Sequence, residues 1–136
     1  MNKKDVNEKI DYAYRALTEC KIAENNKIVK TFRGQISSFG AAVEMGSLKP
    51  AILFFSDQGG SSVKRTNLMD AILYILVQCD KEKTSNVKES NSGDTLYGYI
   101  KQKEEQGVPE YRLKEDVLAA AIAIKLAMNL FELTRE

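Results

Sequence analysis

The chain has 136 residues, of which 43% are hydrophobic and 29% are charged, and its formal net charge is +1. This length and composition are typical of one folded domain and exclude a disordered chain. Histidine is absent, which excludes Ser-His-Asp and Cys-His catalysis and removes the commonest metal ligand. Cys20 and Cys79 match no metal-binding spacing, and we interpret them as reduced, mostly buried thiols of a cytoplasmic protein. We therefore expect no metal and no cofactor.

No targeting or membrane-spanning segment is predicted. The N-terminal stretch MNKKDVNEKIDYAY is charged and has no apolar core, unlike a signal peptide. Residues 117–133 are the most apolar stretch, but they are short for a span and are interrupted by Lys125 and Asn129.

Two helices are predicted in the first third of the chain. The first covers about residues 5–20, and one of its faces carries Val6, Ile10, Tyr14 and Leu17. The second covers about residues 26–45, and steps of three and four residues join Ile28, Phe32, Ile36, Phe39 and Val43. Its opposite side is basic and lightly built, with Lys27, Lys30, Arg33, Gly34, Ser37, Ser38 and Ala41. Such a helix can rest on a core and still admit another backbone closely.

A tight corner follows, in the stretch MGSLKPAILFF. Gly46 suits the left-handed position that ends a helix, and Ser47 suits the N-cap of the next one. Pro50 falls in the first turn of that helix, where a missing N–H costs little. Residues 48–55 are apolar on nearly all sides, so we expect neighbours to enclose this short helix. At least one ring of Phe54 and Phe55 should be fully buried.

Three further helices are predicted after the corner. The fourth begins near Thr66 and has Leu68, Ile72, Ile75, Leu76 and Cys79 on its inner face, and residues 80–93 read as an exposed loop. The fifth runs from a cap at Asp94 to about Gln106, with Leu96, Tyr99 and Ile100 inward, and Gly107 and Pro109 stop it. The last covers about residues 113–134. Its apolar stripe is wide enough for a central helix, or for one that also contacts a partner subunit.

The pattern therefore predicts an all-α protein, a single compact bundle of about six helices in one domain over residues 1–136. No segment of useful length alternates in the manner of a strand.

Residues 21–65 hold the clearest charge signal. Seven basic residues there stand against three acidic residues, a local net of +4. The candidate nucleic-acid-binding residues are Lys27, Lys30, Arg33, Lys49, Lys64 and Arg65. Two interpretations stay open: an ordinary solvated face, or a stripe that follows a phosphate backbone.

No catalytic site is predicted. Glu104–Glu105 and Glu115–Asp116 are adjacent pairs, and adjacent residues on a helix point about 100° apart, so they do not share a site. DQGG and GGSS follow no strand and precede no GKS or GKT, which argues against a phosphate loop.

The corner and its surroundings resemble the small subunit of the type III-B CRISPR effector, the Cmr complex. In that family a helix leads through a Gly-Leu corner into a compact GL-x-x-A-x-x-F helix, and MGSLKPAILFF offers Gly46, Leu48, Ala51 and Phe54 or Phe55. Ser47 between Gly46 and Leu48 departs from the pattern and shifts the register of the corner by one residue. FRGQISSFGAAVE before the corner is similar too, although it lacks the family's usual proline, and so is the closing Ala- and Leu-rich helix.

The resemblance implies a non-catalytic, all-helical subunit that stacks in copies along the inner filament of the complex. There it would pack against backbone subunits and line the channel of guide and target RNA for antiviral interference. A type III-A small subunit with the same role is an alternative. A helical adaptor that binds only protein is another.

Overall fold

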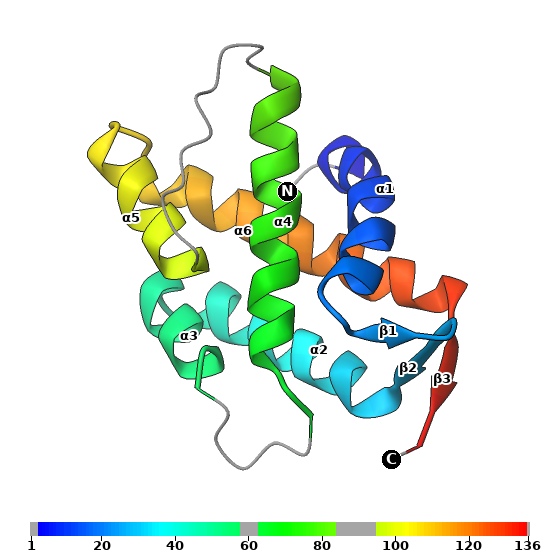
Figure 1. The fold of residues 1–136 in the computed structure, drawn as a ribbon. Helices are drawn as coiled ribbons and strands as arrows, with labels where there is room; N and C mark the ends of the chain where they lie inside the picture. The colour runs from blue at the N-terminus through cyan, green and yellow to red at the C-terminus, as the bar shows by residue number, and fades with distance from the viewer. Residues whose placement is uncertain (1–2, 58–62, 84–94, 136) are drawn as a thin grey trace.

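The computed structural model describes residues 3–57, 63–83 and 95–135, and in this part of the chain it is predominantly helical (Figure 1). The six α-helices are α1 (Lys3–Glu19), α2 (Lys30–Met45), α3 (Leu48–Phe55), α4 (Thr66–Lys83), α5 (Leu96–Glu105) and α6 (Glu110–Ala127). Their buried side chains form one continuous hydrophobic cluster. The predicted helical bundle is therefore confirmed.

The last helix, α6, is the central one, which is one of the two interpretations of its wide apolar stripe. It packs against α1, α2 and α4, and in Figure 1 it runs behind α4. Five of its buried positions are alanines, namely Ala119, Ala120, Ala121, Ala123 and Ala127. Small side chains let the surrounding helices approach the α6 backbone closely, while Val117 and Ile124 fill the core between them.

On α1 the buried face differs from the predicted one at a single position. Val6 and Leu17 are buried, Ile10 is half-buried, and Ala13 and Ala16 complete the inner face. Tyr14 is 43% exposed, and its ring stacks on Phe131 with 5.1 Å between the ring centroids.

A small three-stranded sheet corrects the expectation of a purely helical chain. Its strands are β1 (Ala23–Glu24), β2 (Lys27–Val29) and β3 (Glu132–Thr134), in the order β1-β2-β3. Strands β1 and β2 form an antiparallel hairpin in which Glu24 pairs with Lys27. Asn25 and Asn26 between them have φ values of 53° and 64°, the conformation of a two-residue type I′ turn. The second helix therefore begins at Lys30 and not near residue 26.

The predicted last helix is shortened for the same reason. α6 ends at Ala127, a 3₁₀ turn covers Met128–Leu130, and β3 then runs parallel to β2. The backbone N–H of Glu132 donates to the carbonyl of Asn26 over 3.1 Å. Pairing with a strand more than 100 residues away thus replaces the helical hydrogen bonds that the local sequence favoured.

The corner between α2 and α3 forms where it was predicted, but the backbone conformation of Gly46 differs from the predicted one. Gly46 has φ −131°, so it is not left-handed, but a Cβ there would lie 3.0 Å from the carbonyl oxygen of Ala42. Ser47 occupies the N-cap position of α3 without a side-chain cap hydrogen bond, and Pro50 lies in the first turn. Glycine is favoured here because the chain passes close to the last turn of α2.

The short helix α3 is only half enclosed, contrary to the expectation. Phe55 is 4% exposed and contacts Phe39 edge to face, with 5.4 Å between centroids. Leu53 and Phe54 are 52% and 64% exposed on the other side of the helix. One ring of the Phe-Phe pair is therefore buried, as predicted, and the other lies at the surface.

The remaining boundaries shift by a few residues. α4 begins at Thr66 as expected but continues through Asp80 to Lys83, so these residues are helical and not part of a loop. The rest of the predicted loop and Asp94 lie outside the described residues. Thr95 caps α5, because its Oγ1 accepts a 3.0 Å hydrogen bond from the N–H of Gly98. Gly107, with φ +92°, follows the end of α5, and Leu96, Tyr99 and Ile100 are buried as predicted.

Candidate nucleic-acid interface

The structure divides the six candidate basic residues among three places. Lys27 lies in β2, whereas Lys30 and Arg33 lie in the first turn of α2. Lys49 belongs to α3, and Lys64 and Arg65 come directly before α4. The six residues therefore form no continuous stripe, and Lys27, Lys30 and Arg33 do not share one helical face.

Arg65 lies in the interior and not at an interface. It is 8% exposed, and its Nη2 donates to the carbonyl of Phe54 over 2.8 Å while its Nε donates to the carbonyl of Asp57. Its guanidinium also stacks over the Phe54 and Phe55 rings, at 4.7 Å and 5.1 Å from their centroids. A cation at the carboxyl end of a helix satisfies carbonyls that have no helical partner. Arg65 thus holds the end of α3.

Lys49 and Lys64 are separate surface charges. The Nζ of Lys49 lies 2.9 Å from Oε1 of Glu104, an ion pair that links α3 to α5. That hydrogen bond and the charge of Glu104 raise the pKa of Lys49 above its ordinary value. Lys49 therefore already has a carboxylate partner at the surface. Lys64 is exposed, ahead of the first residue of α4.

A basic edge forms where the small sheet meets α2, and we define it as Lys27, Lys30, Arg33 and Arg135. The parallel register pairs Val29 with Thr134, so Lys30 and Arg135 come next along the two adjacent strands. Both side chains are exposed. Sequence reasoning missed Arg135, because it predicted a helix up to about Thr134 and no sheet. The Asn25–Asn26 turn was the one local signal that could have revealed the hairpin.

The four cations of the basic edge do not contribute equally to its positive potential. Lys27 is paired in register with Glu24 of β1 and with Glu132 of β3, so two carboxylates flank it on one face of the sheet. Arg33 donates from Nη1 to Oδ1 of Asn129 over 2.9 Å, which leaves its other donors available and fixes its position. Lys30, Arg33 and Arg135 therefore supply most of the positive potential of the edge.

The backbone of α2 is open beside these cations. Gly34 is exposed, and no atom lies within 4 Å of the place where its Cβ would be. A phosphate or sugar group can approach the helix there without a steric barrier.

A separate polar network is centred on Asp80. Tyr99 donates to Oδ2 of Asp80, and Nζ of Lys103 lies 2.8 Å from the same carboxylate. Burial and the hydrogen bond to Asp80 raise the pKa of Tyr99 well above its ordinary value, so this hydroxyl stays protonated. The three residues border a hollow of about 370 Å³ with Arg112 and Asp116. Within the described ranges, no three Cys, Asp or Glu side chains gather closely enough to hold a metal ion.

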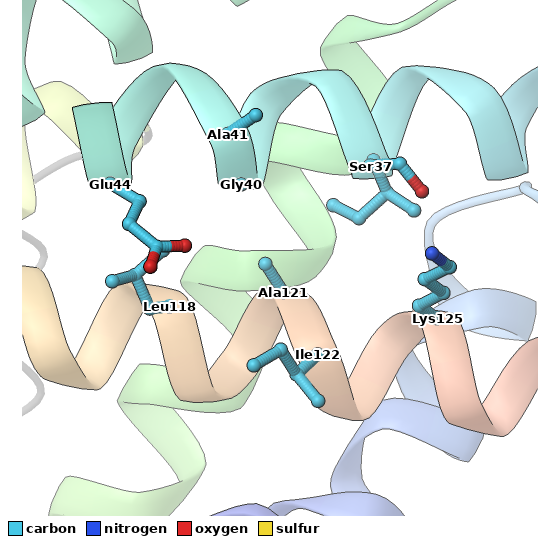
Figure 2. Close-up of a pocket in the computed structure, with 9 residues that line it drawn as sticks. Ser37, Gly40, Ala41, Glu44, Leu118, Ala121, Ile122 and Lys125 are labelled. Carbon is cyan, nitrogen blue, oxygen red and sulfur yellow. The ribbon is translucent and has the colours of Figure 1, made fainter. Parts of the chain in front are cut away.

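A groove between α2 and α6 is the second hollow that sequence reasoning missed. It has a volume of about 260 Å³, with Gly40 and Ala41 on the α2 side and Leu118 and Ile122 on the α6 side. Figure 2 shows Glu44 beside Leu118 at one end of this groove and Lys125 at the opposite end.

Neither cysteine forms a disulfide, and both are half-buried, somewhat more exposed than expected. Among the described helices, none is both long and apolar enough to cross a membrane. Comparison with protein-family models, with curated proteins and with solved structures gives no match.

Proposed function

We propose that the chain is the non-catalytic small subunit of a type III-B CRISPR (Cmr) effector complex in the cytoplasm, where it holds guide and target RNA. The observation that carries the proposal is the basic edge, where β2, α2 and the end of β3 place Lys30, Arg33 and Arg135 at one surface. Two exposed cations, Lys30 and Arg135, and the half-buried Arg33 beside an open helix backbone suit a phosphate chain without selecting a base sequence. The corner motif at Gly46–Phe55 supplies the assignment to the family.

Contacts with backbone subunits and with stacked copies also belong to this proposal. The exposed side chains of Leu53 and Phe54 on α3 are apolar, and the Arg65 guanidinium holds the Phe54 ring in place. A fixed, exposed aromatic ring is typical of an anchor in a protein–protein interface.

That same face favours the second candidate, an adaptor that binds only protein. A type III-A small subunit has the same role as the first candidate and stays a further alternative. The absence of histidine and the scattered carboxylates favour a chain without nuclease activity. Metal-dependent cleavage of RNA or DNA by the purified chain, abolished by one carboxylate substitution, would overturn the non-catalytic assignment.

The RNA-binding test compares wild type with the triple variant K30A/R33A/R135A. Binding of labelled single-stranded RNA is measured across a salt series, for the chain alone and for the complex reconstituted with the other Cmr subunits. Each lost phosphate contact reduces the slope of log K against log salt by about 0.7, so the variant should flatten it by about 2. Affinity should fall for all RNA sequences alike.

The matched control K81A/K101A/R112A removes the same charge from exposed positions on α4, α5 and α6. It should keep the wild-type slope. If the basic-edge variant assembles, binds target RNA and keeps the wild-type slope, the basic edge is only a solvated surface. If wild type binds protein subunits and no RNA, the adaptor is the correct candidate.

A further inference from the structure

One side of the central helix α6 faces away from the bundle. α1, α2 and α4 cover its other sides. On the open side Leu118 is half-buried, while Ile122 and Tyr111 are 36% and 69% exposed. Apolar side chains that continue along one exposed helix face indicate a contact surface.

The open side has the spacing of a helix-pairing seam. Steps of four, three, four and three residues join Tyr111, Glu115, Leu118, Ile122 and Lys125. This is heptad spacing, which keeps the five residues along one line of the helix. Leu118 and Ile122 in its middle are apolar, with the acidic Glu115 before them and the basic Lys125 after them.

The charges make this seam complementary to itself. Glu115 and Lys125 are exposed, and neither forms an ion pair with any other described residue. Both lie five positions from Ala120, and Leu118 and Ile122 both lie two positions from it. An antiparallel second α6, related by a two-fold axis at the level of Ala120, places Glu115 opposite Lys125 and Leu118 opposite Ile122.

The groove of Figure 2 gives the second helix room. Its walls include Gly40, Ala41 and Ala121, which project little, so a side chain from another molecule can enter beside Ile122. Glu44 stands at the Leu118 end of the groove, the end that receives Lys125 of the second copy. The partner's lysine therefore approaches the end of the groove at which Glu44 stands.

We propose that the free chain forms a two-fold symmetric dimer through antiparallel packing of α6 along the groove between α2 and α6. The helix that packs along the groove belongs to a second copy of this chain, because its Lys125 falls opposite Glu115 and its Ile122 falls opposite Leu118. A two-fold contact closes on itself, so it differs from open-ended stacking along a filament. The dimer contact uses no residue of the basic edge, so dimerisation can be tested independently of RNA binding.

Sedimentation equilibrium of the purified chain without RNA tests the dimer. Wild type should show a concentration-dependent dimer that weakens as salt is added. K125E and E115K should each weaken dimerisation at least about tenfold, because each homodimer then carries two like-charge contacts. The double variant E115K/K125E should return towards wild type, and an equimolar mixture of the two single variants should form the mixed dimer.

The control K101E reverses an exposed charge on α5 and should leave the dimer unchanged. Circular dichroism should show that all variants keep the wild-type fold. A wild-type chain that is monomeric at its highest soluble concentration would overturn the proposal. So would species larger than a dimer, or single variants that dimerise as wild type does.

Discussion

Substitution of the two neighbouring phenylalanines in α3 should have very different effects on stability. Phe55 is 4% exposed and packs edge to face on Phe39, so Phe55→Ala leaves a cavity that the bundle fills only in part. Such a change costs about 3–5 kcal/mol of the free energy of unfolding. Phe54 is 64% exposed, and its ring contacts the Arg65 guanidinium, 4.7 Å from the ring centroid, and the Phe55 ring. Because Arg65 is buried, loss of this cation–π contact costs about 1–2 kcal/mol, which is still less than the cavity left by Phe55→Ala.

Urea unfolding followed by circular dichroism measures both changes. The slope of the free energy against urea should stay constant, so that the midpoints report stability alone. If Phe55→Ala unfolds within about 0.5 kcal/mol of wild type, α3 is not anchored in the core. If both variants lose the same amount, the assignment of one ring to the core and one to the surface is wrong.

Two further predictions follow from local geometry. Gly46→Ala should destabilise the protein in urea unfolding by about 1–3 kcal/mol, because the new Cβ would press on the Ala42 carbonyl at 3.0 Å. Gly34→Ala has open space around the new Cβ and should stabilise the protein by about 0.5–1 kcal/mol. Equal effects of the two substitutions would contradict this account of the corner. Burial, followed by the charges of Asp70 and Glu19, raises the pKa of Cys20 from 9.0 to about 11, so alkylation by iodoacetamide at pH 8 should be slower in the folded chain than in urea. The unfolded chain ionises first, so this thiol's contribution to stability should be lost as pH rises from 9 to 11, and Cys20→Ser should remove that part of the pH dependence.

The helices and the core could be predicted from sequence because their signals are local. Ile36, Phe39 and Val43 repeat at helical spacing, and all three are buried on α2. The position of Phe55 relative to Phe54 could not be predicted, because both belong to an apolar run that shows no preferred face. Burial of one ring depends on how α3 lies against α2.

The basic residues were harder to place, because their surroundings come from distant segments. Arg65 and Lys64 are adjacent, yet the Arg65 guanidinium is buried against the end of α3 and the Lys64 side chain is exposed. The strands have two or three residues each, too few for a visible alternation. Arg135 joins the basic edge only through a parallel pairing between segments about 100 residues apart.

The β2–β3 pairing also bears on local unfolding. Strand β3 has three residues and lies at the edge of the sheet, next to β2. Short edge segments open at a lower free energy than a packed core, so β3 can separate from β2 while the described helices stay folded. Arg135 directly follows β3, so it would move away from Lys30 with the strand. The basic edge is therefore complete only while β3 is paired, and amide hydrogen exchange at Glu132–Thr134 would report how often that pairing is lost.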